Sequence, residues 1–155
     1  MPSAVIQPSQ RPMRRARILL AEDDPELRTM VSLLLSADGF EVVEVRDGQQ
    51  LLDYLNGAAA DGTGSSVPDL ILSDVCMPSV DGLQVLEQVR RAELDVPVVL
   101  MTAFATEHMS RHADELGAAT LLTKPFEIDD LRMIVLNLAA LPARNTHQHQ
   151  QRATA

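Results

Sequence analysis

Residues 69–78 of the 155-residue chain read Asp-Leu-Ile-Leu-Ser-Asp-Val-Cys-Met-Pro. The apolar run 70–72 is typical of a strand that is buried on both faces, and it leads directly to the carboxylate of Asp74. Met77 and Pro78 then turn the chain. Because open parallel sheets bind ligands beyond the carboxyl ends of their strands, the sequence predicts that Asp74 lies at a reaction surface.

Three further predicted strands also end in polar residues: Glu22-Asp23-Asp24, Thr102 and Lys124-Pro125. Asp24 and Pro25 are typical of a helix N-terminus, but this role leaves Glu22 and Asp23 unexplained. Adjacent carboxylates repel each other, so a bound cation would account for the pair. Mg²⁺ is usually held by one or two carboxylates and a phosphate. The residue types therefore predict a site where Asp74 takes up a phosphoryl group beside a divalent metal ion.

Thr102 and Lys124 each have a simpler interpretation. Threonine is common in strands because of its β-propensity, and a single lysine is usually an exposed side chain. The occurrence of matching residue types at four strand ends favours the functional interpretation. In it, the hydroxyl of Thr102 donates to a phosphoryl oxygen and Lys124 binds the phosphoryl group as a point charge.

Strand and helix patterns alternate five times along the chain. The predicted strands are 17–21, 40–45, 69–73, 96–101 and 119–122. The predicted helices run from Pro25 to before Gly39, over 48–55, from Gly82 past Val89, over 106–116 and over 127–141. Met30 and Ile128 belong to the apolar spacings of the first and last helices. This alternation predicts an α/β fold with a parallel sheet and right-handed crossovers.

The chain length predicts one domain with two polar ends. We expect a mobile arm over residues 1–16, the folded domain over 17–141 and a disordered polar tail over 142–155. Residues 56–68, rich in Gly, Ala and Ser, are expected to form a loop, which is long for a compact domain.

Composition excludes several classes of protein. No apolar run approaches the roughly 20 residues of a spanning helix, and the N-terminus lacks the apolar stretch of a signal peptide. The single cysteine excludes an intrachain disulfide and suits a reducing cytoplasm. The net charge of −9 disfavours direct nucleic-acid binding. We therefore expect a cytoplasmic protein that contacts neither membrane nor nucleic acid.

Four motifs, taken in order, resemble those of response-regulator receiver domains of two-component signalling. They are Leu-Ala-Glu-Asp-Asp-Pro at 20–25, Ser-Asp-Val-Cys-Met-Pro at 73–78, Met-Thr-Ala at 101–103 and Thr-Lys-Pro-Phe at 123–126. The resemblance covers residues 17–141. It implies a flavodoxin-like (βα)5 doubly wound sandwich, whose five parallel strands lie in the order 2-1-3-4-5.

The resemblance also implies a role for each residue of the acidic group. Asp74 would be the phosphoacceptor, and Asp23 would bind Mg²⁺ or Mn²⁺ directly together with Asp74. Glu22 would act through a bound water, and Cys76 would contribute only its backbone carbonyl.

For the phosphoryl group itself, the resemblance implies two further partners. Thr102 and Lys124 would bind the phosphoryl oxygens, and the peptide bond between Lys124 and Pro125 would be cis. Receiver domains often carry an aromatic switch residue three positions before the lysine, where this chain has Leu121. Phe104 occupies a variable position where access of water to the acyl phosphate is controlled.

Three other features have simpler interpretations. His108 and His112 are spaced like metal ligands on a helix, but no zincin glutamate lies between them, which favours ordinary surface histidines. Cys76 is expected to be a packed thiol rather than a redox sensor. The His-Gln-His run at 147–149 could bind metal loosely, but its place in the expected flexible tail argues against a defined site.

The resulting hypothesis is a phosphoacceptor switch, not a turnover enzyme, that catalyses its own phosphorylation and dephosphorylation. A sensor histidine kinase or phosphotransfer protein would donate to Asp74, and a face formed by the predicted helix 106–116, strand 119–122 and helix 127–141 would contact a downstream protein. Phosphorylation-dependent dimerisation is a further expectation.

Two alternatives stay open at this point. One is a receiver fragment of a larger DNA-binding regulator. The other is a haloacid-dehalogenase-like phosphohydrolase, which would need an acid where this chain has Cys76.

Overall fold

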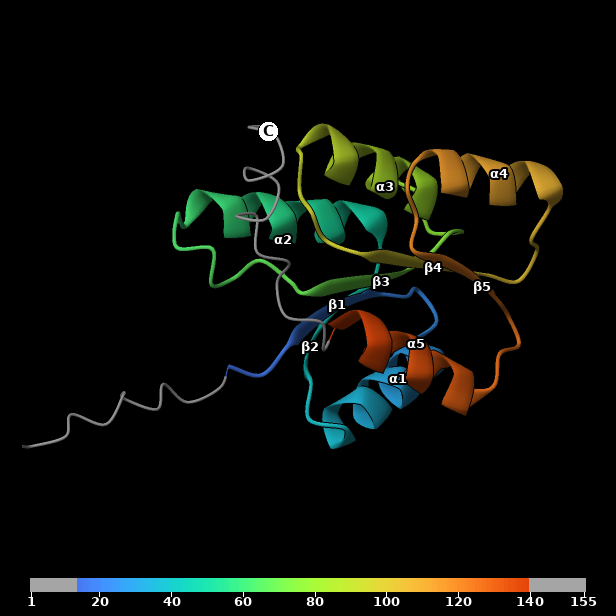
Figure 1. The fold of residues 1–155 in the computed structure, drawn as a ribbon, viewed down its shortest axis with the longest axis horizontal. Coiled ribbons are helices and arrows are strands. Elements are labelled where there is room, and N and C mark those ends of the chain that lie inside the picture. The colour runs from blue at the N-terminus through green and yellow to red at the C-terminus, as the bar shows by residue number, and fades with distance from the viewer. Residues whose placement is uncertain (1–13, 140–155) are drawn as a thin grey trace, which may run out of the picture.

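The computed structural model describes residues 14–139, in which five strands alternate with five helices (Figure 1). The strands are β1 (Arg17–Ala21), β2 (Glu41–Val45), β3 (Leu70–Asp74), β4 (Val98–Thr102) and β5 (Thr120–Thr123). The helices are α1 (Pro25–Ala37), α2 (Gly48–Ala60), α3 (Gly82–Arg91), α4 (Glu107–Glu115) and α5 (Ile128–Ala139). The alternation predicted from the sequence is confirmed, with bounds that shift by a few residues.

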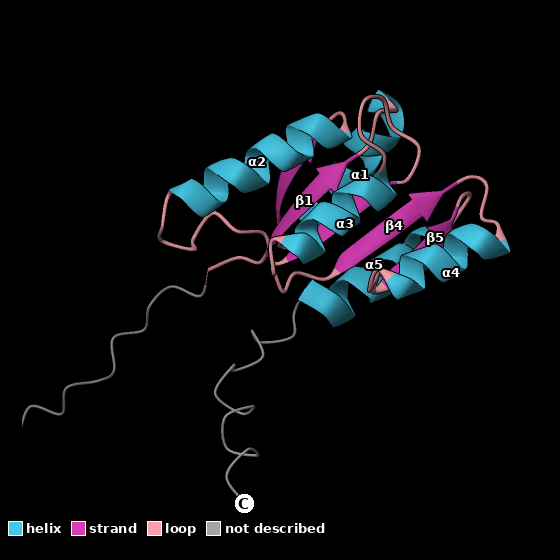
Figure 2. Cartoon of the chain, turned by 90° about the horizontal axis from the view of Figure 1, so that it is seen from above, coloured by secondary structure: helices cyan, strands magenta, loops and turns pink. Residues whose placement is uncertain are grey.

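All five strands are parallel and lie in the order β2-β1-β3-β4-β5. Helices α1 and α5 cover one face of the sheet, and α2, α3 and α4 cover the other (Figure 1). In Figure 2 the arrowheads of β1 and β4 point toward the same edge of the sheet. The flavodoxin-like fold and its strand order are therefore as predicted. The chain reverses its direction of travel across the sheet between β1 and β3, which is where such folds open a crevice for ligands.

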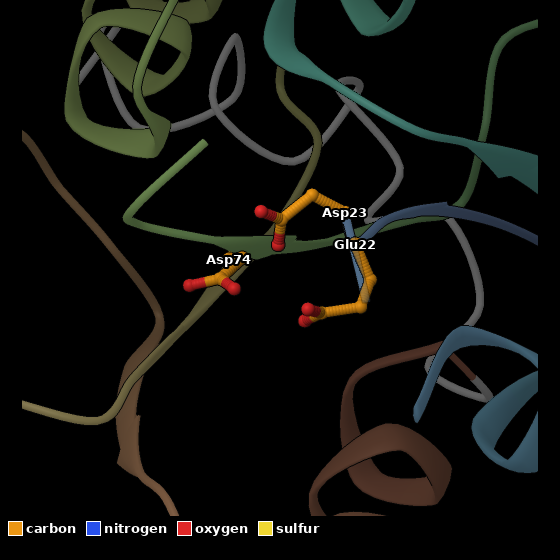
Figure 3. A group of neighbouring side chains, drawn as sticks. All are labelled: Glu22, Asp23 and Asp74. Atoms are coloured by element: carbon orange, nitrogen blue, oxygen red, sulfur yellow. The ribbon is translucent and has the colours of Figure 1, made fainter. Parts of the chain in front are cut away.

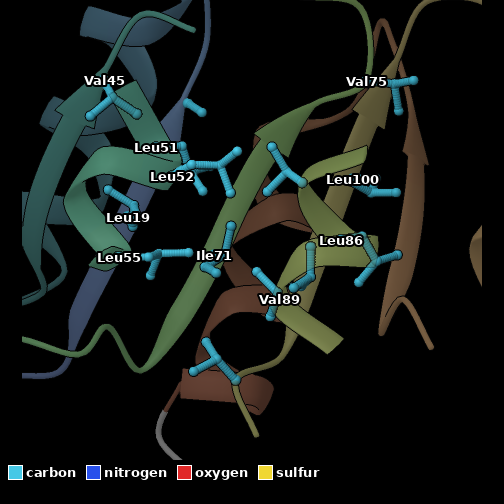
Figure 4. Close-up of a cluster of buried hydrophobic side chains, with 14 of the residues drawn as sticks. Leu19, Val45, Leu51, Leu52, Leu55, Ile71, Val75, Leu86, Val89 and Leu100 are labelled. Atoms are coloured by element: carbon cyan, nitrogen blue, oxygen red, sulfur yellow. The ribbon is translucent and has the colours of Figure 1, made fainter. Parts of the chain in front are cut away.

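Two apolar cores lie on opposite faces of the sheet. The larger joins the inner sides of α2 and α3 to strand residues such as Leu19, Ile71 and Leu100 (Figure 4). The other joins α1 and α5 to residues such as Leu20 and Leu72. Every residue of β3 and β4 is buried, because these central strands are covered on both faces. This burial fixes the strand ends that carry the polar residues.

Helix α1 begins as its sequence predicts but turns a different set of residues inward. The Asp24 side chain accepts from the backbone N–H of Glu26 at 3.0 Å, and Pro25 follows the cap. Val31 is buried, whereas the side chain of Met30 is 42% exposed. The prediction that Met30 faces the core is wrong. Consecutive residues of an α-helix lie about 100° apart around its axis, so Met30 falls outside the buried stripe that contains Val31. Ile128 on α5 is exposed to 38% in the same way.

Helix α2 is longer than predicted and shortens the expected loop. It continues to Ala60, so the prediction of a loop over 56–68 is wrong for its first five residues, 56–60. Leu55 and Ala58 are buried and extend the apolar stripe by another turn, which outweighs the cost of Gly57. The remaining loop is tied down, because the hydroxyl of Tyr54 donates to the carbonyl of Ser66 at 2.9 Å.

The predicted arm and tail lie almost wholly outside the described residues. Within the arm, Arg14 is described, and its guanidinium donates to the Ser65 carbonyl at 2.7 Å and to Asp69 at 3.0 Å. No helix within 14–139 has both the length and the apolar composition needed to cross a membrane.

Candidate functional site

Three carboxylates meet at the carboxyl ends of the neighbouring strands β1 and β3. Glu22 and Asp23 follow β1 directly, and Asp74 is the last residue of β3. One oxygen from each carboxylate lies within 4.8 Å of the others. Figure 3 shows the three groups turned toward a shared space. The fold thus brings together acids that stand at separate strand ends in the sequence.

Asp74 is held in place from several directions. Its side chain is only 7% exposed, and its Oδ1 accepts from the backbone N–H of Cys76 at 3.2 Å. The next residue, Val75, donates its N–H to the Met101 carbonyl of β4 at 2.8 Å and accepts from the N–H of Gly82 at 2.8 Å. These bonds fix the turn after β3, so the carboxylate points into the crevice without freedom to turn away.

Gly82 contributes to this position through its lack of a side chain. A Cβ atom at residue 82 would overlap the backbone carbonyl of Asp74, so only glycine lets α3 begin this close to the end of β3. From the sequence, Asp81 and Gly82 are predicted only as a helix start, which is confirmed by the capping box between Asp81 and Gln84. The close approach depends on tertiary packing and leaves no local sequence signal.

Lys124 reaches the acids from the other side. Its Nζ donates to Asp74 Oδ2 at 2.8 Å and to Glu22 Oε2 at 3.0 Å. Its backbone N–H donates to the carbonyl of Thr102 at 2.7 Å, which sets the end of β5 against the end of β4. The bond between Lys124 and Pro125 is cis. The sequence did not indicate that Lys124 would bind Glu22 as well as Asp74.

The electrostatics of the pocket centre on Glu22, which is 1% exposed. Burial raises the pKa of Glu22, the charge of Asp74 adds to this, and the ammonium of Lys124 opposes it, with a result of about 7 instead of 4.5. Burial alone would lower the pKa of Lys124, but its hydrogen bonds to the two acids outweigh burial and raise it. Near neutral pH the pocket therefore holds a lysine cation between Asp74 and a Glu22 side chain that is about half protonated.

Replacing Glu22 should stabilise the metal-free protein at high pH. The folded state binds a proton at Glu22 up to pH about 7, whereas the unfolded chain releases it near 4.5, so stability is lost between these values as the pH rises. Glu22→Gln removes this loss, and its melting temperature should exceed that of the wild type at pH 8 and converge with it near pH 4. The exposed Glu115→Gln serves as the control. A lower melting temperature for Glu22→Gln at pH 8 would mean that the Glu22 carboxylate stabilises the folded state instead.

Thr102 completes the pocket from β4. It is fully buried, and its Oγ1 accepts from the backbone N–H of Phe104 at 3.2 Å. Since the hydroxyl hydrogen is not used in that bond, Thr102 can donate to a ligand while it holds the following loop. The side chain of Phe104 is 79% exposed at the surface.

Of the two remaining residues near the pocket, Leu121 is partly buried and Cys76 is exposed. Leu121 is half-buried and packs against the core on the α4 side. Cys76 is exposed, so the prediction of a packed thiol is wrong. The turn after β3 directs the Cys76 N–H toward Asp74 and leaves the side chain in solvent.

The donor set suits a hard divalent cation. Asp23 is exposed, whereas Glu22 and Asp74 are buried, so an ion at their shared space would have solvent on one side for the waters that Mg²⁺ retains. Only oxygen donors are present among the three acids, which is the ligand type of Mg²⁺ and Mn²⁺. Within the protein, Lys124 is the cation that offsets Asp74 and Glu22.

Comparison with known proteins shows which proteins the chain as a whole is similar to. The family model for the response regulator receiver domain matches residues 18–136. The chain is 32% identical over 142 residues to the regulatory protein AtoC of Escherichia coli K12, covering 90% of this chain and 29% of that protein. It is 29% identical over 120 residues to the sporulation initiation phosphotransferase F of Bacillus subtilis, covering 77% of this chain and 90% of that protein.

A solved structure agrees with these relatives. The signal receiver domain of a signal transduction histidine kinase from Syntrophus aciditrophicus superposes with a TM-score of 0.71 at 28% identity, covering 83% of this chain and 93% of that one. The chain spans only 29% and 54% of the first two curated relatives that it matches, which are a regulatory protein and a transcriptional regulatory protein.

Proposed function

The chain belongs to the response-regulator receiver family, and from this premise we propose that Asp74 is its phosphoacceptor. Receiver domains are signalling phosphoacceptors of two-component systems and not turnover enzymes. The observation that carries the assignment is the contact of Lys124 Nζ with Asp74 Oδ2 at 2.8 Å, in a pocket where two further acids lie within 4.8 Å. Glu22 shares this contact with Lys124, so the assignment also rests on β3, which ends at Asp74 and pairs with β4, which ends at Thr102.

The proposed reaction transfers a phosphoryl group from a histidine nitrogen of the donor to a carboxylate oxygen of Asp74. A carboxylate oxygen of Asp74 forms a bond to phosphorus while the bond from phosphorus to the donor's imidazole nitrogen breaks, and the electron pair stays on that nitrogen. Bound Mg²⁺ supplies charge neutralisation for the phosphoryl oxygens. Lys124 and the Thr102 hydroxyl supply two further contacts to those oxygens. The chain's own groups thus promote phosphorylation and, with water as the acceptor, dephosphorylation.

Receiver domains bind Mg²⁺ through acidic residues, and here we assign direct coordination to Asp23 and Asp74. The Cys76 carbonyl is proposed as a third protein ligand. Glu22 is proposed to act through a bound water, as the family resemblance implies; its carboxylate also accepts from Lys124 and from the backbone N–H of Asp24. Mn²⁺ would occupy the same set of oxygen ligands.

Asp23→Asn should weaken Mg²⁺ binding more than Glu22→Gln does. Loss of a directly bound carboxylate should cost about tenfold or more in affinity, since ligand charge sets the strength of such sites. Titration calorimetry with MgCl2 measures the difference. Asp24→Asn is the matched control, because it removes a neighbouring charge yet keeps a good helix cap. Full Mg²⁺ affinity in Asp23→Asn would show that the ligand assignment is wrong.

The switch is proposed to pass through the backbone of the loop after β4. A phosphoryl group can shift a conformational equilibrium only if it binds one state better than the other. Thr102 provides such a contact, because the hydroxyl that would donate to the phosphoryl group also holds the N–H of Phe104. Movement of Thr102 therefore moves the loop toward α4, and Leu121 need not rotate as an aromatic would.

A phosphoryl analogue with Mg²⁺ tests this switch by NMR. The largest amide shifts are expected over residues 102–106 and 124–126, with little rotamer change at Leu121. The amides of α2 on the same face of the sheet provide an internal control, because the proposed switch involves no contact between this helix and Thr102 or Lys124. A large reorientation of Leu121 would show that an aliphatic side chain performs the aromatic's role.

Receiver domains interact with histidine kinases and effector domains, and for this chain we propose a sensor histidine kinase or phosphotransfer protein as the donor. A downstream protein is proposed to contact the α4–β5–α5 face. Phosphorylation-dependent dimerisation and a cytoplasmic location belong to the same proposal. The folded domain is proposed to span residues 17–141, with the arm and tail as predicted.

A further inference from the structure

Helix α4 carries a pair of histidines outside the carboxylate pocket. His108 and His112 are both exposed, and their ring centroids lie 6.3 Å apart with the ring planes inclined by 29°. Glu115, the last residue of α4, is also exposed. Nothing in the proposed phosphoryl chemistry uses these three side chains.

The three residues share one side of the helix. Positions i, i+4 and i+7 fall within an arc of about 60° on an α-helix. The core-facing side is different: Ala113 is buried, and Met109 and Leu116 pack against the same core. The two histidines are therefore presented to solvent from consecutive turns of a helix that is anchored by other residues.

The geometry is close to that of two imidazoles on a single ion. With metal–nitrogen distances of about 2.0–2.1 Å, two imidazoles on a tetrahedral ion have ring centroids about 5 Å apart. The observed 6.3 Å between the ring centroids of His108 and His112 is somewhat longer, so the two side chains must rotate toward each other to share an ion. The N-terminal turn that carries His108 is fixed, because the Thr106 side chain caps it by accepting from the N–H of Met109 at 3.1 Å.

We propose that His108 and His112 form a two-histidine surface site for a divalent transition-metal ion of the Zn²⁺, Ni²⁺ or Cu²⁺ class, with water in the remaining ligand positions. Imidazole nitrogen suits these ions, whereas Mg²⁺ is held by oxygen ligands, so the site is chemically distinct from the carboxylate pocket. No glutamate lies between the histidines as a general base, so the site binds metal without hydrolytic chemistry. An ion bound to both histidines would link two consecutive turns of α4, which stabilises the helix and slows its local unfolding.

Titration with ZnCl2 in saturating Mg²⁺ tests the proposal. The protein used for the titration is the 155-residue chain with the substitutions His147→Gln and His149→Gln, so that its remaining histidines are those of α4. His112→Gln is expected to weaken Zn²⁺ binding about tenfold or more, because it removes one of two nitrogen ligands. It should also abolish the slowing of amide hydrogen exchange that Zn²⁺ causes in α4. Glu115→Gln should bind Zn²⁺ about as tightly as the parent, because Glu115 is not assigned as a ligand.

Arg111→Gln is the matched control, since it changes the same helix between the two histidines and leaves both in place. It should bind Zn²⁺ as tightly as the parent. Equal Zn²⁺ affinity in the parent and in His108→Gln/His112→Gln would overturn the proposal. So would Zn²⁺-dependent NMR shifts confined to Glu22, Asp23 and Asp74, which would place the ion in the carboxylate pocket instead.

Discussion

Asp74→Asn is expected to abolish phosphorylation completely. A small phosphodonor with Mg²⁺ should raise the intact mass of the wild-type chain by one phosphoryl group and leave the mass of Asp74→Asn unchanged. The amide cannot act as the nucleophile. We expect that the neighbouring acids do not replace it, because Glu22 and Asp23 follow β1, whereas Asp74 ends β3, the strand next to β4 and its Thr102. Mass spectrometry of both proteins measures the difference.

The substitution should leave the fold intact. An asparagine oxygen can still accept from the N–H of Cys76, and Lys124 keeps its bond to Glu22. A melting curve checks this, and Asp53→Asn provides the control for loss of an exposed acid. If Asp74→Asn were labelled at the wild-type rate, the phosphoacceptor would be another residue and the proposed function of the pocket would fail.

Lys124→Ala is expected to separate phosphorylation from its conformational effect. Asp74 and the acids assigned to the metal remain, so the intact mass should still increase by a phosphoryl group. The response should be lost, because Lys124 is one of two side chains proposed to bind the phosphoryl group more tightly in the active state. The amide shifts over residues 102–106 should fall from their wild-type size to near zero.

Arg132→Ala is the matched control for this experiment. Arg132 also forms a short ion pair, at 2.7 Å to Asp38 between α5 and α1, but it lies outside the pocket. Its loss should leave both the phosphorylation and the amide shifts unchanged. A full wild-type shift pattern in Lys124→Ala would show that Thr102 alone transmits the signal.

The residues of the pocket could be predicted from sequence because strand ends are local features. A buried parallel strand is a short apolar run, and the residue that follows it must lie at the ligand-binding edge of the sheet. Asp74, Thr102 and Lys124 are identified in this way, and the structure places the three at one edge. Their roles in phosphoryl transfer are still a proposal that the variants above test.

The features that could not be predicted depend on how elements approach each other. The extra turn of α2 exists because Ala58 finds a place in the core, and Met30 is exposed because α1 lies at a particular rotation on the sheet. Gly82 and the bond from Lys124 to Glu22 also require the folded arrangement. The orientation of Cys76 follows from the turn geometry after β3, which its residue type does not encode.

Because β5 lies at the edge of the sheet, the side of the pocket that carries Lys124 should resist local unfolding less than the side that carries Asp74. Asp74 ends a strand that has neighbours on both sides and is buried along its whole length. Lys124 follows a four-residue strand that pairs only with β4 and is partly exposed. Segments of this kind open at a lower free energy than the central strands of the same domain. We therefore expect Lys124 to leave the pocket more readily than Asp74 does, so local opening should begin on the lysine side.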